Sequence, residues 1–149
     1  MPVLGQMVLE YKKGQNFNNS KEEQMQKNII SRGVRGAITL KSNTKEEIRQ
    51  ATIELLNEML NKNEIKTEDI SFAIFTLTSD LNADFPAKYA RLDCNFNKVP
   101  MMCYQELDVP NSLKMCLRIL LNINTEKKQN EIKHIYLKDA KLLRGDLNE

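Results

Sequence analysis

Residues 99–121 constrain the fold most, because two apolar runs flank a short polar turn and each run carries one charged group. In the second run, alternation with period two places Arg118 on the same face as Cys116 and Leu120. A guanidinium on a strand that is otherwise apolar on both faces requires an anionic partner or a ligand. Glu106, at the end of the first run, is one candidate partner. Two interpretations stay open here: a structural ion pair, or a site that binds an anion.

The composition is typical of one folded domain. The chain has 149 residues, of which 41% are hydrophobic and 28% charged, and its formal net charge is +2 with both signs interspersed. A chain of this size can bury a core of its own, and it lacks the basic patch that nucleic-acid-binding proteins use. We therefore expect one globular domain and no nucleic-acid partner.

Membrane, secretion and metal signals are missing from the sequence. No apolar run approaches the length of a membrane span, and the N-terminus has no basic region followed by an apolar core. The three cysteines and the single histidine do not have the spacing of metal ligands. We expect a cytoplasmic protein with no membrane partner, no bound metal and no disulfide.

The N-terminal segment differs from the rest of the chain. Residues 14–27 are polar and show no sustained period, which is typical of a weakly ordered segment. We expect residues 1–28 to form a flexible extension and residues 29–149 to form the domain.

The next elements follow from periodicity and capping signals. Alternation from residue 29 to residue 39 predicts a strand with Arg32 and Arg35 on opposite faces. Thr44 and Glu47 have the spacing of a capping box, and apolar residues at helical spacing then continue to a stop at 61–63. A second helix-start signal at 67–69 leads into an apolar run, 70–78, which is typical of a central strand.

A short helix and a further strand complete the pattern. Pro86 suits a first helical turn with Asp84 as N-cap, and Lys88 and Arg91 then share one face, where they either bind a carboxylate or are simply solvated. Residues 132–137 predict a strand on which His134 and Tyr136 share a face. We expect a structural role for His134, with its ring bonded to a backbone carbonyl.

This order of elements predicts an α+β fold with a mixed β-sheet and helices on one face. One long helix covers one face and leaves the opposite face without cover. We expect that face to pack against other copies of the chain in a closed homo-oligomer.

Five separated segments together resemble one known family, the monofunctional chorismate mutases of the bacillus type, or AroH class. They read Arg-Gly-Val-Arg-Gly-Ala at 32–37, Phe-Pro-Ala-Lys-x-x-Arg at 85–91, Cys-x-Gln-Glu-x-Asp-Val at 103–109, Cys-x-Arg at 116–118 and His-x-Tyr-Leu at 134–137. The resemblance runs in register over about residues 30–146. It implies a homotrimer with a central barrel-like core, active sites at subunit interfaces, and the conversion of chorismate to prephenate without a cofactor, in phenylalanine and tyrosine biosynthesis.

The resemblance also implies roles for single residues, beginning with three catalytic ones, Arg118, Glu106 and Arg35. Arg118 matches the cation beside the ether oxygen of the breaking bond. Glu106 and the Cys103 region match the groups at the ring hydroxyl, whereas Arg35 and Tyr136 match those that hold the side-chain carboxylate. The remaining matches are the pocket wall, its mobile cations and the tail that closes over the site: Phe85, Ala87, Lys88, Arg91, Leu143 and Arg144.

The residues fit this chemistry. The substrate is a dianion, and the sequence offers several cations, with Tyr136 as a hydroxyl donor. A pericyclic rearrangement needs no nucleophile, proton relay or cofactor, so Cys103 is interpreted as pocket wall rather than as a nucleophile. Catalysis would come from holding the compact conformer of the substrate and from stabilising the charge that separates in the transition state.

Two other functions are compatible with the expected architecture. A trimeric deaminase of reactive enamines and imines also places an arginine in an interface cleft, but it would lack the pair of Glu106 and Arg118. A catalytically silent trimer would bind chorismate or an analogue without converting it. The number of matching segments favours the mutase over both.

Overall fold

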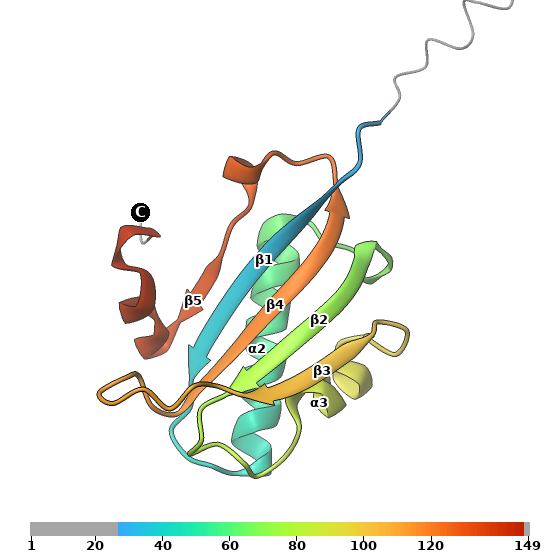
Figure 1. The fold of residues 1–149 in the computed structure, drawn as a ribbon. Coiled ribbons are helices and arrows are strands. Elements are labelled where there is room, and N and C mark those ends of the chain that lie inside the picture. Colours follow the sequence, from blue (N-terminus) through green and yellow to red (C-terminus); the bar gives the residue numbers. More distant parts are fainter. Residues whose placement is uncertain (1–26, 148–149) are drawn as a thin grey trace, which may run out of the picture.

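The computed structural model describes residues 27–147, which form a single mixed β-sheet with two α-helices packed on one face (Figure 1). The strand order is β3-β2-β4-β1-β5; β4 is antiparallel to β1 and β2, whereas β2–β3 and β1–β5 are parallel. The predicted α+β class and the placement of the helices are confirmed. Apart from residues 27 and 28, the expected N-terminal extension lies outside the described residues. The strands are β1 (Ile30–Thr39), β2 (Ile70–Leu77), β3 (Met101–Gln105), β4 (Cys116–Thr125) and β5 (Ile135–Leu137).

The long helix, α2 (Lys45–Asn63), begins where the sequence predicts it. The Thr44 hydroxyl accepts the Glu47 N–H at 3.2 Å, which is half of the predicted capping box. The other half is replaced, because the Glu47 carboxylate accepts the backbone N–H of Lys41 instead. The helix ends at Glu64, which takes a left-handed conformation with φ 56°.

The short helix, α3 (Pro86–Asp93), starts at Pro86 as expected, but its N-cap is Phe85 and not Asp84. The prediction of an Asp84 cap was one residue early. The Asp84 carboxylate instead accepts hydrogen bonds from the backbone N–H of Phe85 and from two side chains of the helix, those of Lys88 and Tyr89.

The core lies between the sheet and α2. Gly36 of β1 permits the close approach, because a Cβ there would overlap Met59 Sδ and come within 3.1 Å of Leu55 Cδ1. Alternate residues of β4 face the same core and are almost fully buried, as are the inner residues of α2: Leu117, Ile119, Leu121, Ile123, Ile48, Leu55, Leu56 and Met59.

The two apolar runs of residues 99–121 form β3 and β4, but they are not neighbours in the sheet. β2 lies between them and pairs with both, and the Glu106 N–H bonds to the Leu77 carbonyl as the chain leaves β3. A helix, α3, connects β2 to β3, and such a connection returns the chain parallel to the strand it left. The short polar turn is therefore a crossing past the end of β2, and not the turn of a hairpin.

The last strand is shorter than the predicted 132–137. Only Ile135–Leu137 pairs with β1. The side chain of Asn63, at the end of α2, binds both the N–H and the carbonyl of Lys133 at 2.8 Å, so those backbone groups are not available to a strand partner. After β5 the chain forms 3₁₀ turns, η3 (Lys138–Leu147), interrupted at Arg144.

The face of the sheet opposite the helices, here called the open face, carries large apolar side chains in solvent. Phe72, Met102, Tyr104 and Leu120 are each between 39% and 58% exposed, and the strand register places all four on this face. Residues of η3 cover it only beside β5, where Ala140 and Leu143 pack near Tyr136. No helix among the described residues is long and apolar enough to span a membrane.

Candidate functional site

Arg118 and Glu106 meet on the open face. Arg118 projects from the middle of β4, and Glu106 immediately follows β3; Arg118 Nη1 lies 3.5 Å from Glu106 Oε2. This ion pair is too long for a good hydrogen bond. Thr76 Oγ1, on the intervening strand β2, donates to the same Oε2 at 2.8 Å, so Thr76 fixes the carboxylate. Both members of the pair are largely buried, with side chains 20% and 25% exposed.

Two buried donors of this face have no hydrogen-bond partner among the described residues: Arg118 Nε and Tyr136 Oη. Leaving a buried polar group unpaired costs about 1–3 kcal/mol, so such groups call for an explanation. The register places both side chains in one row across the sheet, separated by Ala37 of β1. Their strands are two strand spacings apart, so the Cα atoms of Arg118 and Tyr136 are about 10 Å apart, with the small side chain of Ala37 between them. This arrangement suits a ligand that supplies acceptors to both.

Arg35 lies on the open face of β1, two residues before Ala37 and opposite Leu120. Its backbone N–H donates to His134 Nδ1 at 3.0 Å. The hydrogen bond that the structure shows for the ring is thus to a backbone N–H and not to the expected carbonyl, with Nδ1 as the acceptor. Burial lowers the pKa of His134, and the charges of Arg144 and Arg35 lower it further.

The tail reaches the same region. Leu143 packs against a small buried cluster formed by Ala37, Cys116, Tyr136 and Ala140. Arg144, at the break in η3, lies close enough to His134 to affect its pKa. The structure thus gathers more than half of the predicted site residues into one group, here called the open-face cluster: Arg35, Glu106, Arg118, Tyr136, Leu143 and Arg144.

The other predicted residues gather elsewhere, around a cavity of about 370 Å³ beside α3, here called the α3 pocket. Its wall consists of Phe85, Ala87, Lys88, Arg91, Met101 and Cys103. Cys103 pairs in register with the fully buried Phe75, which places its side chain on the helix side of the sheet.

The two groups lie on opposite faces of the sheet. Cys103 points to the helix side, whereas the Glu106 carboxylate bonds to Thr76 on the open face. A single chain therefore brings the predicted residues together as two separate half-sites. One chain by itself does not bring Cys103 and Glu106 to one small ligand.

The cysteines of the two half-sites are poor nucleophiles. Burial raises the pKa of the Cys103 thiol, against a smaller opposing effect of the Ala87 backbone N–H. Burial likewise raises the pKa of Cys116, and the Arg118 guanidinium offsets only part of it. Both thiols stay protonated near neutral pH. In residues 27–147, no three His, Cys, Asp or Glu side chains are grouped as metal ligands.

Sequence reasoning missed three residues that hold the half-sites. Thr76 orients Glu106, and Asp84 and Tyr89 form a polar network with Lys88. Alternation along residues 70–78 would place Thr76 on the face of Arg118 only if the two strands were known to be neighbours. The four-residue spacing of Asp84 and Lys88 was a usable signal, but the N-cap interpretation of Asp84 concealed it.

Fold and half-sites together define a class: a small α+β protein that presents arginine and tyrosine donors beside a carboxylate on an uncovered sheet face. Such a surface suits a compact anion.

Comparison with known proteins identifies the family. The sequence pattern of chorismate mutase type I matches residues 31–147. Chorismate mutase AroH of Bacillus subtilis (strain 168) is 41% identical over 120 residues, which cover 80% of this chain and 94% of that protein. Chorismate mutase AroH of Thermus thermophilus is 44% identical over 117 residues, or 78% and 95% of the two chains.

A solved chorismate mutase from Clostridium thermocellum has the same fold, with a TM-score of 0.73 and 44% identity over 74% of this chain and 98% of that one. The chain belongs to the chorismate mutase type I family, isomerases that convert chorismate to prephenate. The resemblance seen in the sequence is confirmed, and the deaminase alternative falls away.

Proposed function

We propose that this protein carries out the reaction of its family, the rearrangement of chorismate to prephenate, at sites that form between copies of the chain. The single observation that carries the proposal is the pair of Arg118 and Glu106, with Arg118 Nε buried beside it and unpaired within the described part of the chain. A fixed, partly desolvated guanidinium that still has a free donor can stabilise an oxygen on which negative charge develops.

Arg118 acts on the ether oxygen. In this rearrangement the carbon–oxygen bond breaks before the new carbon–carbon bond is complete, so the oxygen becomes enolate-like in the transition state. The neighbouring strands β1 and β2 hold Arg118 in place, so its donor does not have to reorganise during the reaction. One such preorganised donor is typically worth about 3–4 kcal/mol, or about 10²–10³-fold in rate.

The other members of the open-face cluster bind and orient. Glu106, fixed by Thr76, accepts a hydrogen bond from the ring hydroxyl and offsets positive charge on the ring. Arg35 and Tyr136 hold the side-chain carboxylate, which gives the unpaired Tyr136 hydroxyl an acceptor. Binding both ends of the substrate favours the compact conformer in which the reacting carbons meet.

The second half-site would come from another copy. The α3 pocket supplies Phe85, Ala87, Cys103 and the cations Lys88 and Arg91, and the tail with Leu143 and Arg144 closes over the complete site. The exposed apolar side chains of the open face support a homotrimer in which the sheets form a central barrel-like core. Three identical heterologous contacts close a ring and yield three equivalent sites. The cytoplasmic location and the domain boundary at residue 29 stay predictions within this proposal.

The first test is turnover of chorismate by the purified protein, followed as loss of chorismate absorbance, with prephenate confirmed by acid conversion to phenylpyruvate. We expect Arg118→Lys to lower kcat by about 10²-fold or more, because lysine does not present the planar fork of donors. Arg32→Lys is the matched control: Arg32 lies on the helix side of β1 and binds Lys127 and Gln129. Near-normal turnover by Arg118→Lys would remove the catalytic assignment.

The interface is tested by mixing inactive chains. Arg118→Ala disables the half-site on the open face, and Arg91→Ala disables the half-site at the α3 pocket. The homotrimer of each variant should therefore have impaired turnover. Co-expression of the two, with separate tags for purification of hybrids, should restore about a third of the sites in the hybrids, because one interface in each mixed ring combines two intact halves. If each site belonged to one chain, the hybrids would stay as inactive as their parents.

A further inference from the structure

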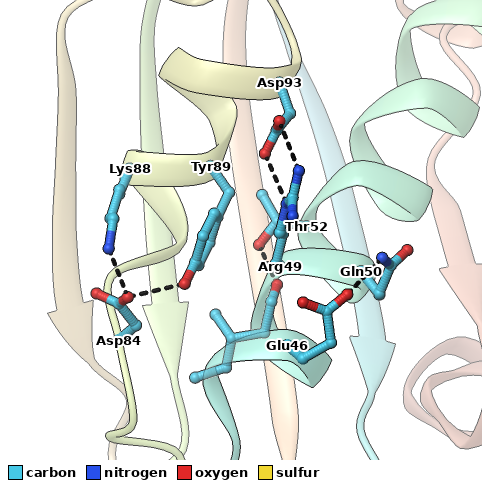
Figure 2. A network of polar contacts seen from close by, with 9 residues as sticks. Glu46, Arg49, Gln50, Thr52, Asp84, Lys88, Tyr89 and Asp93 are labelled. Carbon is cyan, nitrogen blue, oxygen red and sulfur yellow. Dashed lines mark hydrogen bonds and ion pairs between the residues drawn. The ribbon is translucent and has the colours of Figure 1, made fainter.

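The carboxylate of Asp84 is held by three donors at the start of α3, and Figure 2 shows two of them, Lys88 and Tyr89. Its Oδ2 accepts from Lys88 Nζ at 2.9 Å and from the Tyr89 hydroxyl at 2.8 Å, and its Oδ1 accepts from the Phe85 N–H at 2.8 Å. The Asp84 side chain is only 12% exposed, whereas that of Lys88 is 42% exposed. The anion is thus fixed by its surroundings, and the cation is the more exposed partner.

Asp84 lines the cavity next to the α3 pocket, whose wall includes Lys88. This neighbouring cavity has a volume of about 420 Å³ and shares Phe85 and Cys103 with the α3 pocket. An anionic substrate carboxylate that reaches Lys88 therefore comes close to a second, permanent carboxylate.

This carboxylate is charged over the whole working range of pH. The hydrogen bonds from Lys88 and Tyr89 hold the pKa of Asp84 well below its usual value. The same contact raises the pKa of Lys88. Lys88 thus faces the pocket as half of a neutral ion pair, with two of its three N–H donors still available.

We propose that Asp84 sets the affinity of the α3 pocket for its dianionic ligand, by holding Lys88 in a neutral pair with which an incoming carboxylate must compete. The inference rests on the proposed function, in which Lys88 binds substrate. Arg118 rather than Lys88 acts on the breaking bond, so Asp84 weakens substrate and transition state alike and acts on KM. Substrate and product carry the same charge, so weaker binding also speeds product release.

The test is the steady-state kinetics of Asp84→Asn, which removes the charge and keeps an acceptor for the Phe85 N–H. We expect KM to fall about fivefold at low salt, as for one unit charge a few ångströms away in a largely solvated site, with kcat within about twofold of wild type. Inhibition by prephenate should tighten in parallel. The difference should shrink as salt rises, since screening weakens the effect of an exposed pair.

Asp93→Asn is the matched control. Asp93 is the last residue of α3, the helix that Asp84 precedes, and its loss changes the net charge equally, but it pairs with Arg49 of α2 at 3.1 Å (Figure 2). Its KM should equal that of wild type. An equal fall in KM for both variants would show a general charge effect and overturn the inference.

The remaining outcomes separate the inference from the proposed function. Suppose that the wild type is active and that Asp84→Asn is folded. An unchanged KM for the variant would mean that Asp84 has a structural role only. A raised KM would mean that Asp84 orients Lys88 for substrate. Either result overturns the inference but not the proposed function. An unchanged KM for Lys88→Ala would do the same, because it would show that Lys88 does not bind substrate. A wild type that does not convert chorismate removes both. Thermal unfolding checks the fold, and Asp84→Ser serves as a second variant if Asp84→Asn does not fold.

Discussion

Single backbone and side-chain contacts hold the proposed catalytic groups in place. Glu106 takes its position from a hydroxyl on the neighbouring strand, Thr76, and not from its ion-pair partner Arg118. Arg35 is fixed through its backbone N–H, which His134 accepts. Neither positioning contact uses a guanidinium donor, so both leave the donors of Arg118 and Arg35 to a ligand.

The contact from Arg35 to His134 predicts a pH dependence of stability. The bond needs a neutral ring, and burial with the charges of Arg144 and Arg35 lowers the pKa of His134 in the folded chain. As pH falls below about 6.5, the unfolded chain takes up a proton that the folded chain does not, so the free energy of unfolding falls. It should continue to fall until the pH reaches the lowered pKa of the folded state.

The measurement is the free energy of unfolding by denaturant between pH 7.5 and pH 5. His134→Asn is the control, because the Asn carbonyl can accept the same N–H without titrating. The wild-type curve should drop more steeply than that of His134→Asn as pH decreases. Parallel curves would show that His134 does not contribute to the pH dependence.

At the scale of elements, the position of α2 on the sheet depends on the absence of one side chain. A Cβ at Gly36 would collide with Met59 and crowd Leu55, and both of these residues are fully buried. The same strand carries Arg35 on its other face, so a shift of β1 away from α2 would displace a group of the open-face cluster.

Gly36→Ala should therefore destabilise the fold by about 1–3 kcal/mol, the usual effect of overpacking a filled core. Gly33→Ala is the matched control, because its Cβ would meet only Leu120 Cδ1 at 3.6 Å, an ordinary contact. Chemical denaturation of both variants measures the difference. Equal stability of the two variants would mean that Met59 can move aside freely.

At the scale of the whole molecule, the open face is the face of the sheet that no α-helix of the described residues covers. It combines exposed apolar residues with buried donors that have no partner within residues 27–147, whereas the opposite face is covered by α2 and α3 (Figure 1). The half-sites on the two sides of the sheet make assembly and activity depend on each other in the proposed trimer.

Leu120→Glu should separate these properties. Leu120 lies on the open face and is 41% exposed, so a charge there should disrupt subunit packing and remove activity while each chain stays folded. Sedimentation velocity and circular dichroism measure assembly and fold. Ile29→Glu, at an exposed apolar residue before β1, should remain a trimer with normal turnover. An active Leu120→Glu trimer would exclude the open face as the interface.

The sequence by itself determined the elements whose signals are local. Alternation predicted β1 and placed Arg118 with Cys116 and Leu120, and capping with helical spacing predicted α2. These features depend on residues a few positions apart, so the chain encodes them directly. The recognisable segments also indicated the family and the residues of both half-sites, although their roles are still proposals.

Only the tertiary structure decided which strands are neighbours and which partners the backbone and polar side chains bind. In the folded chain, β2 lies between β3 and β4. The strand β5 is short because the side chain of Asn63 binds the backbone of Lys133. Asp84 forms an ion pair with Lys88 and does not cap the helix. The tertiary structure also made His134 an acceptor and put Cys103 and Glu106 on opposite faces. Each outcome depends on hydrogen bonds or packing between residues distant in the chain, and periodicity carries no information about them.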